Sequence, residues 1–197
     1  MIAFLKLIRL QNLIVIAFTQ YMVRWCLIFP VLKLRGLELQ LSNLNFFLVV
    51  LATVMIAAAG YIINDYFDLR IDKVNKPNRI LVGKGVKRRV AMGAHTVINI
   101  IAIAISFYVA KSIGLWKISI LYFICATGLW FYSTTFKRQF LIGNVVIAIF
   151  TGLVPFIVGI FELTPCYKAY LPLDASISFK DIWIYVIAIS FFATITT

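Results

Sequence analysis

Charged side chains are scarce in this sequence. Only 13% of its 197 residues are Asp, Glu, Lys or Arg, and just seven of these are acidic. Soluble domains contain about 25% charged residues, because their surfaces face water. A hydrophobic share of 63% and a mean hydropathy of +1.00 agree with this. The composition excludes a soluble globular domain and a disordered chain, and it indicates a polytopic membrane protein.

Cysteine and histidine are also rare. Cys26, Cys125 and Cys166 are widely spaced and form no CxxC pair, and the single His95 cannot build a histidine metal site alone. Positive charge, in contrast, is abundant, with 19 Lys and Arg and a net charge of +12. In so apolar a chain, basic loops serve to orient membrane helices and to face anionic lipid. We therefore expect membrane lipids and no nucleic acid as partners.

Long apolar runs dominate the chain. A transmembrane helix needs about 20 apolar residues, and six stretches meet this length. We therefore expect an all-α transmembrane bundle that forms a single domain over residues 1–197. The six stretches are Leu13–Leu32, Phe46–Asn64, Val90–Ala110, Ile118–Phe136, Phe140–Phe161 and Ile182–Thr197.

The basic residues predict the orientation of these stretches. With the N-terminus in the cytoplasm, twice as many Lys and Arg fall on the inner segments as on the outer ones. We expect a multi-pass protein of the cell's inner membrane with this orientation. Arg24 falls inside the first stretch, and we expect it to snorkel toward the outer head groups. Three acidic residues fall on the outer side of the membrane, and we expect no role in catalysis for them: Glu162, Asp174 and Asp181.

The acidic residues gather where the second apolar stretch ends. In NDYFDLRID, residues 64–72, Asp65, Asp68 and Asp72 share one face of a helix. Like charges on one face repel, so something positive should neutralise them. Mg²⁺ suits carboxylate oxygens, and Asn64 adds another oxygen. The alternative is a solvated helix end whose carboxylates pair with nearby Lys and Arg.

Cations follow directly after these carboxylates. Lys76 and Arg79 flank Pro77, which stops a helix and turns the chain back. A carboxylate site for Mg²⁺ beside Lys and Arg suits a pyrophosphate, because the metal and the cations divide its oxygens between them. At a membrane surface, such a head group predicts a lipid tail that runs between the helices.

These residues resemble the UbiA superfamily of intramembrane prenyltransferases. NDYFDLRID matches the family's first Asp-rich motif, NDxxDxxxD, at every specified position. RLQN over residues 9–12 resembles the RPxN element, with Leu10-Gln11 where the family has its proline. YSTTFK over residues 132–137, followed by Gly143-Asn144, resembles the family's Tyr/Lys element.

The resemblance implies a fold and a truncation. The family usually has nine transmembrane helices around a central cavity and two Asp-rich motifs that hold Mg²⁺ and prenyl pyrophosphate. This sequence shows only the first motif and ends at Thr197 within the sixth apolar stretch. We therefore expect six of nine helices of a longer prenyltransferase domain, which is incomplete at its C-terminus.

The resemblance also implies residue roles in transfer of a prenyl group from an allylic pyrophosphate, by its ionisation, to a hydrophobic acceptor. Asp65, Asp68 and Asp72 are the expected catalytic ligands of the cofactor Mg²⁺. Asn12 and Tyr132 are expected near the head group, although helix–helix hydrogen bonds are an alternative for both. The full set expected to bind substrate is Asn12, Asn64, Lys76, Arg79, Tyr132 and Lys137.

The acceptor is open between two kinds. DKVNKPNR, residues 72–79, resembles the ether-lipid branch of the family, whose acceptor is geranylgeranylglyceryl phosphate. The alternative acceptor is an aromatic acid of quinone synthesis.

Two other classes of protein fit the sequence less well. CDP-alcohol phosphatidyltransferases need Asp-Gly followed by Ala-Arg, but Tyr66 follows Asp65 here. In a transporter or channel we expect charged residues within several apolar stretches, and here only Arg24 lies within one.

Overall fold

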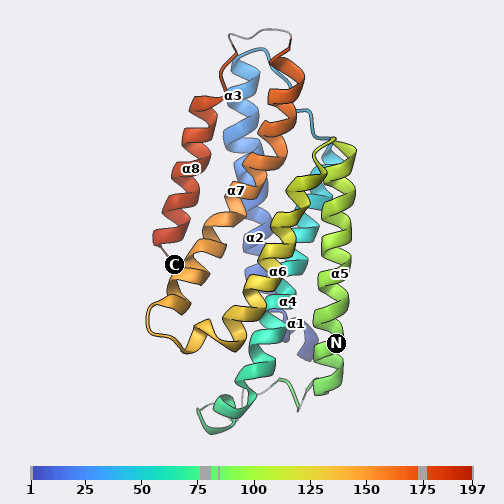
Figure 1. Ribbon diagram of the computed structural model, residues 1–197, viewed down its shortest axis with the longest axis vertical. Coiled ribbons are helices and arrows are strands. Elements are labelled where there is room, and N and C mark those ends of the chain that lie inside the picture. Colours follow the sequence, from blue (N-terminus) through green and yellow to red (C-terminus); the bar gives the residue numbers. More distant parts are fainter. Residues whose placement is uncertain (1, 76–80, 84, 173–176, 197) are drawn as a thin grey trace.

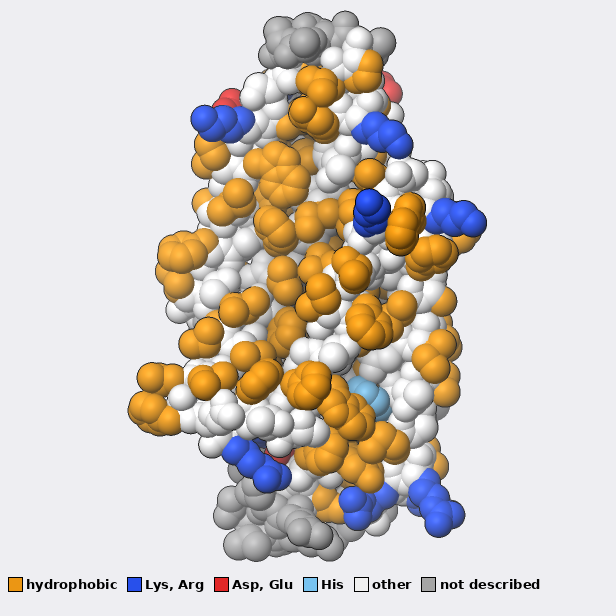
Figure 2. Space-filling view, viewed as in Figure 1, with side chains coloured by type: hydrophobic (Ala, Val, Ile, Leu, Met, Phe, Trp, Pro, Cys, Tyr) orange, Lys and Arg blue, Asp and Glu red, His pale blue; other side chains and the backbone are white. Residues whose placement is uncertain are grey.

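The computed structural model describes residues 2–75, 81–83, 85–172 and 177–196. Within these ranges the regular elements are helices, apart from one isolated bridge between Val82 and Val86. The helices form an elongated bundle along one long axis (Figure 1). Hydrophobic side chains cover the middle of the face in Figure 2, and Lys and Arg lie toward its ends. The expectation of an all-α fold is confirmed.

The first apolar stretch is a helix with a wider central turn. After α1 (Ile2–Leu7), α2 (Leu10–Met22) passes into the π-helical segment η1 (Val23–Ile28), which leads into α3 (Phe29–Leu34). Pro30 lies at the start of α3. Because proline lacks an amide N–H and its ring crowds the preceding turn, it accounts for the loosened backbone there.

Helix α4 (Asn43–Asn75) is the central element of the bundle and packs against α2, α5 and α6. A Cβ atom added at Gly60 would lie 2.9 Å from Leu129 Cδ1 of α6, so this glycine brings the two helices close together. The helix continues past Asn64, where we expected the apolar stretch to end, and so carries the Asp-rich motif in helical geometry.

Four further helices complete the bundle: α5, α6 and α7 pack against α4, and α8 packs against α7. Helix α5 (Arg88–Ser112) runs beside it, and α6 (Ile120–Thr134) lies between the 3₁₀ turns η2 (Trp116–Ser119) and η3 (Phe136–Arg138). Helix α7 (Ile142–Tyr170) packs against α8 (Lys180–Ile195). A Cβ at Gly159 of α7 would lie 2.7 Å from Val186 Cγ1 of α8.

Within the residues that the structure describes, four of the six expected spans are helices long and apolar enough to cross a membrane. These segments are Leu10–Leu34, Asn43–Leu69, Arg88–Ser112 and Ile142–Tyr170. Helices α6 and α8 have 15 and 16 residues. At 1.5 Å per residue they reach roughly 22–24 Å, against a hydrocarbon core of about 30 Å. That these two also cross the membrane stays a prediction.

The expected snorkelling of Arg24 is wrong. Its side chain lies in the core, where Nε is 2.9 Å from Glu162 Oε1 and Nη2 donates to Leu41 O at 2.7 Å. The guanidinium also stacks over the Phe46 ring at 4.3 Å. Glu162 is likewise fully buried, within α7 and not in an outer loop. Each charge is neutralised by a residue far away in the sequence, which a hydropathy pattern does not reveal.

A candidate carboxylate site

The end of α4 carries the predicted carboxylates. Asn64, Asp65 and Asp68 are each partly exposed on this helix, and the side chains of Asp65 and Asp68 are 22% and 16% exposed. Asn64 Nδ2 donates to Asp68 Oδ2 at 3.1 Å, across one helical turn. This arrangement places two carboxylates and an amide at the rim of the bundle, where they are half shielded from water.

Cations from two other segments meet these carboxylates. Arg9, between α1 and α2, lies 3.3 Å from Asp65 Oδ1 through Nη2. Lys137, in η3, forms an ion pair with Asp68 and donates to Asn64 Oδ1 at 3.0 Å. One cation precedes its carboxylate by 56 positions and the other follows its carboxylate by 69, and both converge on the motif. The cations also offset the repulsion between the acids.

The junction that carries Arg9 has an unusual backbone. Arg9 has φ of 52°, in the left-handed region that non-glycine residues seldom adopt. This turn directs its guanidinium over the Tyr61 ring at 4.8 Å. Asn12 Nδ2 donates to the hydroxyl of the same Tyr61 at 3.3 Å. The RLQN element is therefore joined to α4 one turn before Asp65.

Most of the predicted site residues within the described ranges lie together. Asn12, Asn64, Asp65, Asp68 and Lys137 surround the end of α4 through the contacts above. Tyr132 lies half-buried in the last turns of α6, the helix that leads to Lys137. The backbone of Asp72 continues α4, while its side chain, and Lys76 and Arg79, lie outside the described residues.

The sequence pattern missed Arg9 and Tyr61 as site residues. Two signals could have indicated them. Arg9 belongs to the same RLQN element as Asn12, and Tyr61 is four residues before Asp65 and so lies on the same face of α4.

The donor set suits a hard divalent cation. Mg²⁺ prefers carboxylate and amide oxygens, which Asp65, Asp68 and Asn64 supply from one helix face. No group of three or more His, Cys, Asp or Glu side chains is close enough to hold a metal within the part of the chain that the structure describes. The described residues fit a magnesium site that uses two carboxylates and takes its other ligands from substrate or water.

The fold and the site together define a class: an α-helical integral membrane protein that presents a half-buried carboxylate cluster at one end of an apolar helix. Residues 36–197 match the UbiA prenyltransferase family. The chain belongs to this family, whose members are integral membrane transferases.

Three similar proteins are named digeranylgeranylglyceryl phosphate synthase. The chain is 31% identical over 158 residues to the one from Sulfurisphaera tokodaii, which covers 80% of this chain and 52% of that protein. It is 30% identical over 154 residues to the one from Sulfolobus acidocaldarius, covering 77% and 50%. It is 30% identical over 167 residues to the one from Metallosphaera sedula, and this match covers 80% of this chain and 50% of that protein. The chain therefore spans about half the length of these curated relatives. No solved structure matches it.

Proposed function

We propose that this chain is part of a Mg²⁺-dependent enzyme that transfers a prenyl group from a prenyl pyrophosphate to geranylgeranylglyceryl phosphate within the membrane. One observation carries the proposal. Asp65 and Asp68 meet Arg9 and Lys137 at the end of an apolar helix, so oxygen ligands for a metal and donors for an anion share one site. A substrate with a pyrophosphate head and an apolar tail fits such a place.

The chain's own residues divide the work as follows. Asp65 and Asp68, with Asn64 in support, would hold Mg²⁺, which supplies charge neutralisation for the departing pyrophosphate. Arg9 and Lys137 would donate to phosphate oxygens, because each cation already lies against this helix face. Asp72 as a third ligand, and Lys76 and Arg79 as further pyrophosphate contacts, stay predictions.

The proposed reaction breaks one bond at C1 of the prenyl group and forms another. The C1–O bond of the allylic pyrophosphate breaks, and its electron pair leaves with the pyrophosphate. The acceptor hydroxyl oxygen then bonds to C1 and loses its proton, which the departed pyrophosphate can accept. The allylic cation must be kept from water in between, which the apolar faces of the surrounding helices would do. Asn12, bonded to Tyr61, and the nearby Tyr132 are proposed to contact the substrate head group.

The choice of acceptor rests on similarity. The relatives reported above are named as synthases of digeranylgeranylglyceryl phosphate, and this chain is about 30% identical to them. An aromatic acid is the alternative acceptor within the same family.

We also propose that residues 1–197 belong to one membrane domain of about nine helices, with the N-terminus in the cytoplasm.

The test uses the full-length protein that contains this chain, purified in detergent. It is incubated with Mg²⁺, labelled geranylgeranyl pyrophosphate, and either geranylgeranylglyceryl phosphate or an aromatic acid. We expect product with the glyceryl phosphate, and loss of product in Asp68→Asn. Asp181→Asn is the matched control, because it makes the same change in an exposed ion pair with Arg35.

Each other outcome has a clear meaning. Product with the aromatic acid alone would move the protein to quinone synthesis. No product with either acceptor, together with ion flux through vesicles containing the protein, would favour a channel. Product that persists in Asp68→Asn would remove this carboxylate from the mechanism.

A further inference from the structure

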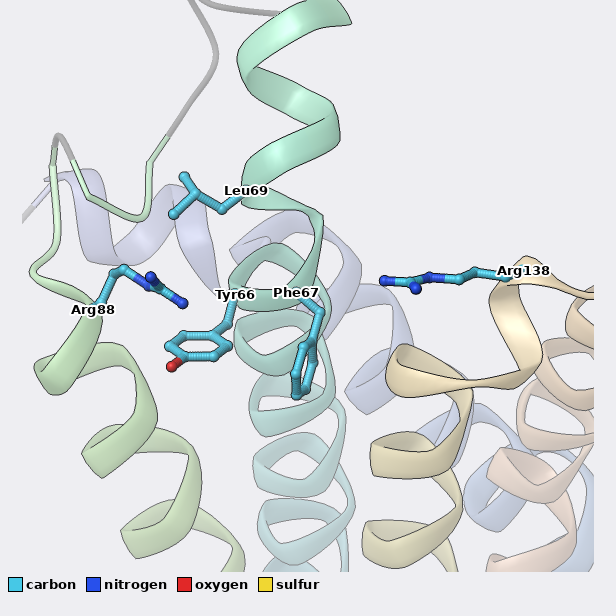
Figure 3. A pocket seen from close by; sticks show the side chains of 5 residues that line it. All are labelled: Tyr66, Phe67, Leu69, Arg88 and Arg138. Carbon is cyan, nitrogen blue, oxygen red and sulfur yellow. The ribbon is translucent and has the colours of Figure 1, made fainter.

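A pocket lined by arginines and aromatic rings lies beside the cytoplasmic end of α4 that carries the carboxylates, using the orientation predicted above. A pocket of about 360 Å³ is lined by Tyr66, Phe67, Leu69, Arg88 and Arg138. Figure 3 shows Arg88, from α5, and Arg138, from η3, extending toward each other across the two aromatic rings. A neighbouring pocket of about 470 Å³ shares Tyr66 and Arg88 and adds Arg89 and Met92. Arg88 and Arg138 therefore line one pocket with Tyr66 and Phe67, and Arg89 lines the neighbouring pocket with Tyr66.

This pocket is separate from the carboxylate site. At about 100° per residue, Tyr66 and Phe67 each point roughly 130° around α4 from the midline between Asp65 and Asp68. In Figure 3 the N-terminal helices pass behind α4, whereas the rings of Tyr66 and Phe67 lie in front of it. Leu69, which also lines the pocket, points about 70° from that midline, so the pocket borders the carboxylate side at Leu69 and turns away from it at the two rings.

The guanidinium groups of Arg88 and Arg138 are exposed and can donate to an anion. The ion pairs at this end of the bundle join Asp65 to Arg9 and Asp68 to Lys137. Among the residues that the structure describes, neither Arg88 nor Arg138 has a carboxylate within ion-pair distance. Arg88 instead stacks over the Tyr66 ring at 4.8 Å, which holds its guanidinium at the pocket.

The floor of the pocket continues into an apolar surface. Phe67 packs edge-on against Trp130 of α6, with 5.6 Å between ring centroids, and Trp130 lies 5.4 Å from the ring of His95 on α5. These contacts place aromatic rings between α5 and α6 on the side of the arginines that leads into the bundle. An occupant thus meets cations at one end and rings at the other.

We propose that this pocket, formed by Arg88, Arg138, Tyr66 and Phe67, binds an anionic phospholipid of the surrounding membrane. The lipid phosphate lies between the two guanidinium groups, which suit phosphate oxygens through paired N–H donors. The hydrocarbon chain lies along Phe67 and Trp130. Membrane lipid is the occupant because Arg88 and Arg138 are exposed at an end of the apolar bundle, where basic side chains attract anionic head groups. This site is independent of the proposed prenyl transfer.

The test measures lipid binding to the full-length protein in detergent by native mass spectrometry. Phosphatidylglycerol is the anionic probe and phosphatidylcholine the neutral one. We expect the double variant Arg88→Gln/Arg138→Gln to bind phosphatidylglycerol at least about tenfold more weakly, since each basic residue near an anionic lipid contributes about 1 kcal/mol. The double variant Arg88→Lys/Arg138→Lys keeps the charge and should retain much of the affinity.

The control changes two exposed lysines at the other end of the bundle, Lys33→Gln/Lys117→Gln, for the same loss of charge. It should bind phosphatidylglycerol as the parent does. Equal losses in both Gln variants would overturn the proposal, because net charge alone would then explain binding. Displacement of the lipid by millimolar inorganic phosphate would also overturn it, since the site would then select a free anion. Equal affinity for phosphatidylcholine would do the same.

Discussion

Arg24 and Glu162 bring opposite charges together inside an apolar bundle. Their side chains are 2% and 0% exposed, and Nε and Oε1 are 2.9 Å apart. Within the described part of the chain, neither carboxylate oxygen of Glu162 accepts a hydrogen bond. Charge attraction therefore links η1 to α7. Removal of one partner would leave the other charge buried and uncompensated, which costs more than the pair itself contributes.

We predict that Arg24→Met lowers the free energy of unfolding by about 3–5 kcal/mol. The double variant Arg24→Met/Glu162→Met should recover most of this loss, because no charge is then left alone. Thermal unfolding in detergent, followed by circular dichroism, measures both. Arg35→Met is the control. It breaks a pair of the same length whose side chains are 31% and 63% exposed, and should cost less than about 1 kcal/mol. Similar losses in Arg24→Met and Arg35→Met would contradict this account of the buried pair.

At the level of residues, the sequence predicted the local grouping of the carboxylates better than the contacts between helices. Helical spacing was sufficient to place Asp65 and Asp68 on one face, because the motif is local. Arg9 and Glu162 were missed in their roles, because each acts through a partner on a different helix. No period within one helix carries that information.

At the level of elements, the apolar runs predicted where the helices lie but not how they end. Helix α4 continues to Asn75 because a charged sequence can remain helical after its apolar run stops. The ends of α6 tighten into 3₁₀ turns, so its α-helical part is shorter than the apolar stretch Ile118–Phe136. The π-helical turn before Pro30 depends on backbone geometry, which hydropathy does not measure.

Gly143 controls the placement of η3, the short element that carries Lys137. A Cβ at this position would lie 3.0 Å from Phe136 O and 3.1 Å from Lys137 Cα. Because these are backbone atoms, η3 itself must move to make room. We predict that Gly143→Ala costs about 1–3 kcal/mol of stability and weakens binding of prenyl pyrophosphate through the displaced Lys137.

Gly93→Ala is the matched control for this substitution. Gly93 lies in α5 with no atom within 4 Å of an added Cβ. Alanine there should be neutral or stabilising by up to about 1 kcal/mol, because it favours the helix. Thermal unfolding and pyrophosphate binding, measured on both variants, test the difference. Equal behaviour of the two alanine variants would show that the contact of Gly143 with η3 is unimportant.

At the level of the whole molecule, the distribution of basic residues predicts that the carboxylate end faces the cytoplasm. We expect Lys117→Cys, in a background without other cysteines, to react with a membrane-impermeant maleimide in intact cells. Lys87→Cys, at the start of α5, should react only after the membrane is permeabilised. Both side chains are exposed, so accessibility to the reagent depends on the side of the membrane. Labelling of Lys87→Cys alone in intact cells would reverse the orientation.

The central position of α4 also affects biosynthesis. The chain emerges from the ribosome starting at its N-terminus, so Arg9 is made before Asp65 and Asp68, and Lys137 follows them. Helix α4 is thus synthesised after α2 and before α5 and α6, and it packs against all three. In each of the two ion pairs, the segment made later contains the residue that completes the pair. A nascent chain halted after α4 would already contain both partners of the Arg9–Asp65 pair, whereas Asp68 gains Lys137 only once η3 has been synthesised.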